Sequence, residues 1–324
     1  MFSSAVAIRV DQVRKAYANH VAVRDVSLQV PTGTVYGVLG PNGAGKTTTI
    51  RMILNLMVPD AGRIEVLGRP AGDPSVSDRV GYLPEERGLY RKMEVRRVLR
   101  FLGRLKGLPT KEANRRIDRW LERVGLRTAT QDWGAAKVED LSRGMQQKVQ
   151  FVGTMLHEPD LVILDEPFSG LDPVNAQVLK DTVLELRREG RTVVFSTHLM
   201  DNAERMCDAV AIISRGEVVA DGALHALKKA YGGPGRVVIE FAGHGRDRAR
   251  AVIEDPALVR AIDDHGQRVE LDLAPEASAQ QLLAALVAHE VEIVKFDRTD
   301  ASLHRIFLER VGATGVEAGL SGNG

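Results

Sequence analysis

A glycine-rich stretch that follows an apolar run constrains this chain more than any other feature. It reads Gly40-Pro-Asn-Gly-Ala-Gly-Lys-Thr-Thr48 and matches G-x-x-x-x-G-K-[ST], the pattern of a phosphate-binding loop between a strand and a helix. Residues 34–39 suit a buried strand and residues 48–56 suit a helix, so both flanks fit the motif. Glycine permits the backbone conformations and close approaches that such a loop needs, and it occupies positions Gly40, Gly43 and Gly45.

This loop predicts nucleotide binding. Its N–H groups can surround phosphate oxygens, helped by the positive end of the following helix. Lys46 would place its charge between the β- and γ-phosphates, and the Thr47 hydroxyl would ligate Mg²⁺. A glycine-rich turn formed by chance is the alternative, and the strand and helix on either side argue against it. We expect the whole loop to contact the nucleotide: Gly40, Pro41, Asn42, Gly43, Ala44, Gly45, Lys46, Thr47 and Thr48.

The chain is long enough, at 324 residues, for one large domain and a smaller one. Its composition, 44% hydrophobic and 27% charged, is ordinary for a soluble globular protein. It shows no apolar run of membrane-spanning length and no N-terminal signal, so we expect it to be cytosolic or held at a membrane by a partner. The single cysteine, Cys207, excludes an intrachain disulfide and fits a reducing compartment.

Two later apolar runs end in polar residues that suit catalysis. Residues 161–164 read as a buried strand followed by Asp165 and Glu166, and ligands of α/β sheets bind outside the carboxyl ends of the strands. Asp165 is the expected partner of the Mg²⁺, and Glu166 can accept a proton from the attacking water. The run 192–197 delivers His198 to the same edge, where it would contact the γ-phosphate, although a lone histidine is more often structural.

Five other residues have both a functional and a structural interpretation. Tyr17, at a turn after alternating strands, provides either a flat face for adenine or a core-edge aromatic. Glu85 follows a short strand and either faces the ligand or lies in a solvated acidic loop. Ser142 is a helix N-cap, and with Gly144 it also forms a second anion site that a single nucleotide does not need. Asp172 is a further N-cap.

Residues from about 94 to 156 have helical spacing, so we expect a helical subdomain inserted into an α/β core. The segment is basic, with 14 Lys or Arg against 4 Asp or Glu between Arg87 and Arg127. A solvated helix face is the first explanation. The alternatives are contact with an acidic partner, with lipid head groups or, last, with nucleic acid, because no nucleic-acid-binding motif accompanies the charges.

In their type and order, these motifs resemble the ATP-binding subunits of ABC transporters from about residue 8 to residue 227. The resemblance implies a P-loop (RecA-like) α/β core with an inserted helical subdomain. It implies that Tyr17 stacks on adenine and that residues 40–48 are the Walker A loop. Asp165 then ends the Walker B strand, and Glu166 is the catalytic glutamate.

The same resemblance assigns the remaining candidates. Ser142 and Gly144 would bind the γ-phosphate held by a partner chain. Residues 169–172, ending in Asp172, would form the D-loop, and His198 would be the switch histidine. These roles imply a site completed by a second chain.

Two departures from the family pattern point to a subgroup. Glu85 replaces the usual glutamine, and a carboxylate there can still ligate Mg²⁺ or orient water. Arg143 and Met145 replace glycine and glutamine in the signature, whose Ser142 and Gly144 are kept. Both variants resemble the ABC-2-type exporters, which include sodium-efflux (NatA-like) ATPases with an extra C-terminal domain.

The sequence after residue 235 predicts that extra domain. We expect an ABC ATPase domain over residues 1–230, a small α+β domain over 236–311 and a disordered tail over 312–324. The α+β expectation rests on predicted strands at 236–241, 268–273 and 291–296 and on predicted helices at 276–289 and 302–308.

The resemblance implies an ATP-hydrolysing exporter subunit that uses ATP and Mg²⁺ at the cytoplasmic face of the cell membrane. Its partners would be a separate transmembrane permease and a second ABC ATPase subunit, which we expect to be an identical chain; we expect no nucleic-acid partner. The alternative is a soluble ABC ATPase acting on a ribosome or nucleic-acid complex. Such proteins carry two cassettes or a long coiled coil, and neither pattern is present in this sequence.

Overall fold

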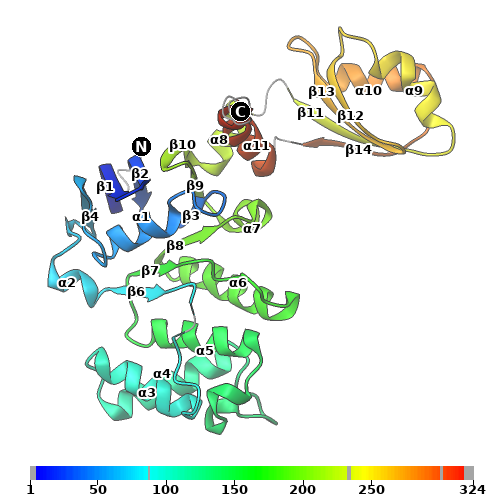
Figure 1. Cartoon of the computed structure of the whole chain (residues 1–324). Coiled ribbons are helices and arrows are strands. Elements are labelled where there is room, and N and C mark those ends of the chain that lie inside the picture. Colours follow the sequence, from blue (N-terminus) through cyan, green and yellow to red (C-terminus); the bar gives the residue numbers. More distant parts are fainter. Residues whose placement is uncertain (1–4, 87, 232–234, 300–301, 317–324) are drawn as a thin grey trace. The chain divides into compact units, whose positions relative to one another are not determined.

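The computed structural model describes residues 5–86, 88–231, 235–299 and 302–316 and divides into two compact units (Figure 1). The first is Met1–Asp221 and the second is Gly222–Gly324. Each unit has a hydrophobic core of its own, as independent domains do. Within the described ranges, no helix has both the length and the apolar character needed to cross a membrane.

A ten-stranded sheet organises the first unit. Its strands are β1 (Val6–Tyr17), β2 (His20–Pro31), β3 (Val35–Leu39), β4 (Ala61–Val66), β5 (Arg69–Pro70), β6 (Val80–Leu83), β7 (Leu161–Leu164), β8 (Thr192–Thr197), β9 (Ala209–Ser214) and β10 (Glu217–Ala223). Their order is β5-β4-β1-β2-β10-β9-β3-β8-β7-β6. The strands from β9 to β6 are parallel, so β3, β6, β7 and β8 end at one edge. Every residue of β3, β7, β8 and β9 is buried, as expected of apolar runs in a parallel sheet.

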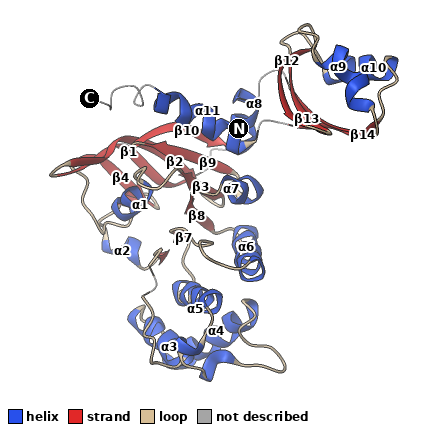
Figure 2. Cartoon of the chain, turned by 45° about the vertical axis from the view of Figure 1, so that its right-hand side comes forward, coloured by secondary structure: helices blue, strands red, loops and turns tan. Residues whose placement is uncertain are grey.

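Helices cover both faces of this sheet. The α-helices described in this unit are α1 (Lys46–Ile53), α2 (Pro74–Ser77), α3 (Val95–Leu105), α4 (Thr110–Arg123), α5 (Arg143–Met155), α6 (Pro173–Arg188) and α7 (Met200–Met206). Figure 2 shows α6 and α7 on one side of the strands and α1 on the other. Helices α3, α4 and α5 contact one another beyond β6 and β7, which is the inserted helical subdomain expected from the sequence (Figure 1).

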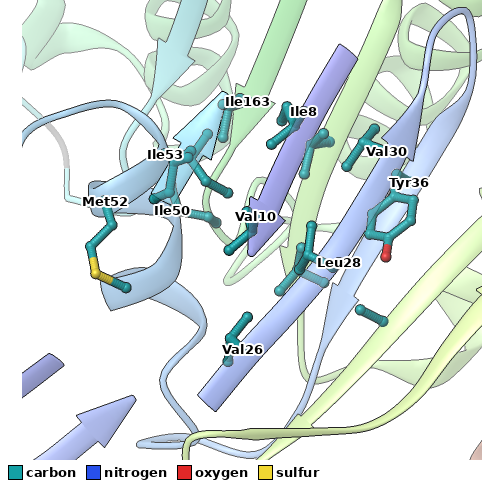
Figure 3. Packing of buried hydrophobic residues seen from close by; sticks show 14 of the residues in the cluster. Ile8, Val10, Val26, Leu28, Val30, Tyr36, Ile50, Met52, Ile53 and Ile163 are labelled. Carbon is teal, nitrogen blue, oxygen red and sulfur yellow. The ribbon is translucent and has the colours of Figure 1, made fainter. Parts of the chain in front are cut away.

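The core of the first unit fixes the helix that follows the phosphate-binding loop. In β1 and β2 alternate residues are buried, including Ile8 and Val10 on one strand and Leu28 on the other. Ile50 and Ile53 of α1 belong to the same buried cluster, in which Figure 3 shows them near Ile8 and Val10. The apolar side of α1 therefore determines where its first turn lies.

The second unit is a four-stranded antiparallel sheet with two helices on one face (Figure 2). Its strands are β11 (Arg236–Phe241), β12 (Val259–His265), β13 (Arg268–Leu273) and β14 (Ile293–Thr299), in the order β12-β13-β11-β14. Helices α9 (Gly245–Ile253) and α10 (Ala279–Ala288) cover the sheet, while α8 (Leu224–Tyr231) and α11 (Leu303–Val316) contact each other. The chain order β-α-β-β-α-β gives a split βαβ arrangement, so the expected α+β class is confirmed.

The structure differs from the expectations for this unit in three places. Helix α9 and strand β12 were not predicted. The predicted end of the first domain, residue 230, lies within α8. Helix α11 continues to Val316, so residues 312–316 of the predicted disordered tail are helical. A glycine inside a helix, such as Gly312, costs only about 1 kcal/mol of stability and does not by itself end the helix. Residues 317–324 of that tail lie outside the described ranges.

Candidate active site

The phosphate-binding loop lines a cavity of about 410 Å³ in the first unit. Residues 42–48, which run from the loop into the first turn of α1, form one wall. The phosphate-binding loop, the adenine-stacking candidate Tyr17 and the catalytic candidate Glu166 therefore surround one cavity. The other lining residues are Tyr17, His20, Ala22, Glu85 and Glu166, of which His20 and Ala22 were not predicted.

The backbone of the loop requires glycine just before α1. Gly45 has φ +105°, which side-chain-bearing residues rarely adopt. A Cβ at this position would lie 2.6 Å from the carbonyl oxygen of Ala22 on β2. The close approach of loop and strand brings Ala22 into the cavity wall.

Lys46 is held inside the loop. Its side chain is only 6% exposed, and its Nζ donates to the carbonyl oxygens of Gly40 at 2.8 Å and Pro41 at 3.0 Å. The same Nζ lies 3.7 Å from Oε1 of Glu166. Burial lowers the pKa of Lys46, an effect that the carboxylates of Glu166 and Asp165 oppose. Gly40 and Pro41 therefore take part in the site through their carbonyl groups, although they do not line the cavity.

Asp165, at the end of β7, is the most buried acid of the site, at 1% exposed. Its Oδ1 accepts hydrogen bonds from the Thr47 hydroxyl at 3.3 Å and from the Ser196 hydroxyl at 2.5 Å. Its Oδ2 is buried and has no hydrogen-bond partner among the described residues. A free carboxylate oxygen beside a threonine hydroxyl fits Mg²⁺, which prefers oxygen ligands and is usually shared with substrate phosphates.

Glu166 is oriented by its neighbours on β8. Its φ of +46° is unusual for a residue with a side chain, and its N–H donates to the Ser196 hydroxyl at 2.8 Å. Its Oε1 lies 3.0 Å from Nδ1 of His198, whose side chain is 41% exposed. The carboxylate thus lies between an ammonium group and an imidazole. Ser196 joins Asp165 to Glu166 and was missed from the sequence, where it reads as an ordinary residue of a buried strand.

Tyr17 is the last residue of β1 and lines the cavity. Its side chain is 47% exposed, and its hydroxyl donates to the sulfur of Met57 at 3.1 Å. An exposed ring fixed at its hydroxyl offers a flat surface on which a base can stack. His20 follows it after a two-residue turn, and that proximity in the hairpin is the sequence signal that could have identified it.

The remaining candidates do not line this cavity. Ser142 caps α5, where its Oγ accepts from the N–H of Met145 at 3.3 Å, and Asp172 caps α6 by accepting from the N–H of Asn175 at 3.0 Å. A Cβ on Gly144 would lie 2.5 Å from the side-chain nitrogen of Asn175. The structure therefore joins the starts of α5 and α6 to each other, and both lie apart from the nucleotide cavity of the same chain.

Family profiles match both units. The family described as "ABC transporter" matches residues 23–169, and the family described as "ATP-binding protein DrrA1-3-like, C-terminal domain" matches residues 222–311. The first match contains the phosphate-binding loop, Asp165 and Glu166.

Relatives and solved structures agree with these matches. An uncharacterized ABC transporter ATP-binding protein of Bacillus subtilis (strain 168), YhaQ, is 40% identical over 94% of this chain and 99% of its own length. The linearmycin resistance ATP-binding protein LnrL of the same organism is 33% identical over 95% of this chain and 99% of its own length. The ABC transporter ATP-binding protein NatA, also of that organism, is 41% identical over 64% of this chain and 83% of its own length. A solved ATP-binding subunit of an ABC transporter aligns with a TM-score of 0.63 at 33% identity, covering 70% of this chain and 93% of that one.

Proposed function

The chain belongs to the ABC transporter ATP-binding proteins and is an ATP hydrolase, and we propose that it hydrolyses ATP in the cavity at the phosphate-binding loop, with Glu166 as the base. One observation carries this proposal. Glu166 is 8% exposed and lines the cavity, and its carboxylate lies beside Lys46 and His198. A carboxylate that lines the cavity and is oriented by an imidazole is placed to accept a proton from water.

Each side chain of the site has a proposed role. Lys46 binds the β- and γ-phosphates once its Nζ leaves the carbonyls of Gly40 and Pro41. Thr47 and the free Oδ2 of Asp165 would hold Mg²⁺, which supplies positive charge to the phosphates.

The other contacts position these groups. Tyr17 stacks on the base, and the remaining residues of the loop, from Gly40 to Thr48, bind phosphate through their N–H groups. His198 holds Glu166 and contacts the γ-phosphate. Glu85 lines the cavity and would reach the metal or the water.

We further propose that the site is completed by a second ABC subunit, which would be an identical chain. Ser142 and Gly144 form an anion-binding helix start that lies apart from this chain's own cavity. Ser142 and Gly144 of one chain would bind the γ-phosphate held by the other, and the D-loop that ends at Asp172 would contact the same interface. ATP then joins two surfaces, and hydrolysis separates them.

The transport role follows from the relatives. The name of LnrL states linearmycin resistance, and that of another relative, from Rhizobium, states Nod factor export. We infer export through a separate transmembrane permease, with this chain at the cytoplasmic face of the membrane. Recovery of one multi-span protein with the tagged chain from solubilised membranes is the expected result, and recovery from the soluble fraction alone would contradict the inference.

The base assignment is tested with Glu166→Gln. We expect ATP to bind as in the wild type while turnover falls at least about 100-fold, since loss of a positioned base costs 10²–10⁴-fold. Light scattering after size exclusion should show an ATP-dependent dimer that persists. The control is Glu86→Gln, the same change at an exposed acid, which should leave turnover unchanged. Near-normal turnover in Glu166→Gln would remove this residue from its role.

The shared site is tested by mixing two inactive variants. Lys46→Ala lacks the phosphate ligand, and Ser142→Gly lacks the signature hydroxyl with little loss of helix capping. In a mixed dimer, one site has the intact loop of one chain and the intact signature of the other. We therefore expect ATPase activity on mixing that neither variant has alone. No gain on mixing would show that each chain works by itself.

A further inference from the structure

The sheet of the second unit leaves strand β14 open on one side. The strand order β12-β13-β11-β14 places β12 and β14 at the two edges, so among the described residues each has only one neighbouring strand. The free side of an edge strand presents a row of backbone N–H and C=O groups, with which a strand of another chain can pair. The two edges differ in how their charged side chains are used.

The acidic side chains of β12 are paired within the unit. Asp263 lies 3.6 Å from Arg236 of β11, and Asp264 is ion-paired with Arg246 of α9. Because these contacts already engage its carboxylates, the β12 edge offers a second chain little free charge.

The charges of β14 have no such partners. Among the described residues, Lys295 and Asp297 pair only with each other, at 3.5 Å, and their side chains are 53% and 49% exposed. Phe296, between them, is opposite the buried Ile239 of β11, so it lies on the face covered by helices while the two charges lie on the open face. Val294 of the same strand is 67% exposed. The β14 edge therefore exposes two opposite charges, two residues apart, on one face of the sheet.

We propose that β14 pairs, in antiparallel orientation, with β14 of a second copy of this chain. With the two-fold axis at Phe296, Lys295 of each copy lies opposite Asp297 of the other, and two ion pairs form across the interface. Moving the axis to residue 295 or to residue 297 places like charges opposite each other, which is destabilising. The charge pattern of β14 therefore selects the partner, which is the same sequence, and a single register.

The other side chains of the strand fit this register. Charged residues on an edge strand normally prevent pairing between chains, but here they are complementary about the centre of the strand. The two Phe296 rings meet at the axis, and Val294 lies opposite Arg298, whose aliphatic stem can cover it. The contact uses the second unit and not the nucleotide cavity, so it needs no ATP and rests on no part of the proposed function.

The test is sedimentation velocity of the purified full chain without nucleotide, over a range of micromolar concentrations. We expect a concentration-dependent dimer both for the wild type and for Lys46→Ala, which lacks the phosphate ligand. Asp297→Lys replaces both cross-strand ion pairs with like-charge pairs, so its self-association should be weaker by at least about 10-fold. Lys295→Asp should weaken self-association in the same way.

Mixing these two variants tests the register itself. The Asp297→Lys chain carries lysine at positions 295 and 297, and the Lys295→Asp chain carries aspartate at both. In a mixed dimer, each lysine lies opposite an aspartate, whereas each variant alone brings like charges together. With one variant labelled by a fluorophore, we therefore expect a mixed dimer that neither variant forms with itself. Misfolding of either variant would not produce this recovery.

A matched control reverses the same charge elsewhere in the unit. Glu254→Lys changes an exposed acid at the end of α9 that pairs with Arg250, and it alters the net charge as Asp297→Lys does. This control should self-associate as the wild type does. Thermal unfolding followed by circular dichroism shows whether each variant is folded.

Three results would overturn the proposal. The first is a wild type that stays monomeric without nucleotide at every concentration. The second is equal self-association of Asp297→Lys and Glu254→Lys. The third is the absence of a mixed dimer from Asp297→Lys and Lys295→Asp. Near-normal turnover in Glu166→Gln would leave all three measurements unaffected, so failure of the catalytic assignment is distinguishable from failure of this contact.

Discussion

Replacing Ser196 by alanine tests whether the base and the Mg²⁺ ligand are held by one hydroxyl. Ser196 is fully buried; it accepts from the N–H of Glu166 at 2.8 Å and donates to Oδ1 of Asp165 at 2.5 Å. Ser196→Ala leaves the Glu166 N–H unpaired, which costs about 1–3 kcal/mol of stability. It also removes a hydrogen bond to a charged group, which costs about 1.5–3 kcal/mol. The long bond from Thr47 to Asp165 remains in the variant, so we expect the lower half of the summed cost, and the free energy of unfolding should fall by about 2.5–4 kcal/mol.

Urea unfolding followed by tryptophan fluorescence measures this loss in the first unit, which contains both tryptophans, Trp120 and Trp133. The control is Thr182→Val, because that buried hydroxyl donates only to the carbonyl of Val178 in its own helix, at 2.7 Å. It should change stability by less than about 1 kcal/mol. ATPase activity should also fall in Ser196→Ala, because Glu166 loses the bond that holds its strained backbone. Equal stability of Ser196→Ala and Thr182→Val would show that the Ser196 hydroxyl does not hold the two acids.

Three further outcomes are expected. Lys46→Ala should abolish the rise in melting temperature that ATP produces, because the phosphate ligand is lost, and an unchanged shift would contradict the loop assignment. Gly144→Ala should lower stability by about 1–3 kcal/mol, because its Cβ meets Asn175; adding Asn175→Gly should restore part of the loss if that contact is the cause. Burial raises the pKa of Asp272, but the hydrogen bonds and charge of Arg305, with other arginines, lower it on balance below 3.8. The ionised Asp272 therefore stabilises the fold at pH values above 3.8, and this stabilisation is lost as the pH falls through the lowered pKa of Asp272. Asp272→Asn should make acid unfolding of the second unit, followed by circular dichroism, less steep.

The fold of the first unit was predictable because its signals are local. The loop motif, the apolar runs of β3, β7 and β8, and the helical spacing of α3 to α5 each lie within a short stretch of sequence. Parallel strands place their carboxyl ends at one edge, so Glu166 and His198 were expected to lie together, and they are 3.0 Å apart. The ABC fold and family are confirmed, while the roles of the individual site residues stay predictions.

Ser196 and Asn175 were not predictable for a physical reason. Ser196 lies in a run of buried strand residues, and only the register that pairs Leu164 with Phe195 places it beside the two acids. Asn175 follows a helix cap, and only the packing of α5 on α6 brings it against Gly144. In the second unit, β12 has just one buried residue, Val259, so its sequence lacks the apolar alternation that predicts a strand.

The number of charged residues in the sequence of the helical subdomain does not show which of those charges are ion-paired in the structure. The count of 14 basic against 4 acidic residues between Arg87 and Arg127 favoured a solvated helix face. In the structure, acids from outside that segment neutralise several of these arginines: Asp132 pairs with Arg96 of α3, and Glu158 and Glu185 pair with Arg119 and Arg123 of α4. Within the described ranges, the basic residues of this segment that make no ion pair are Arg91, Lys92, Arg97, Arg100, Arg104, Lys106 and Lys111, so the unpaired charge lies between residues 91 and 111 rather than along the whole segment.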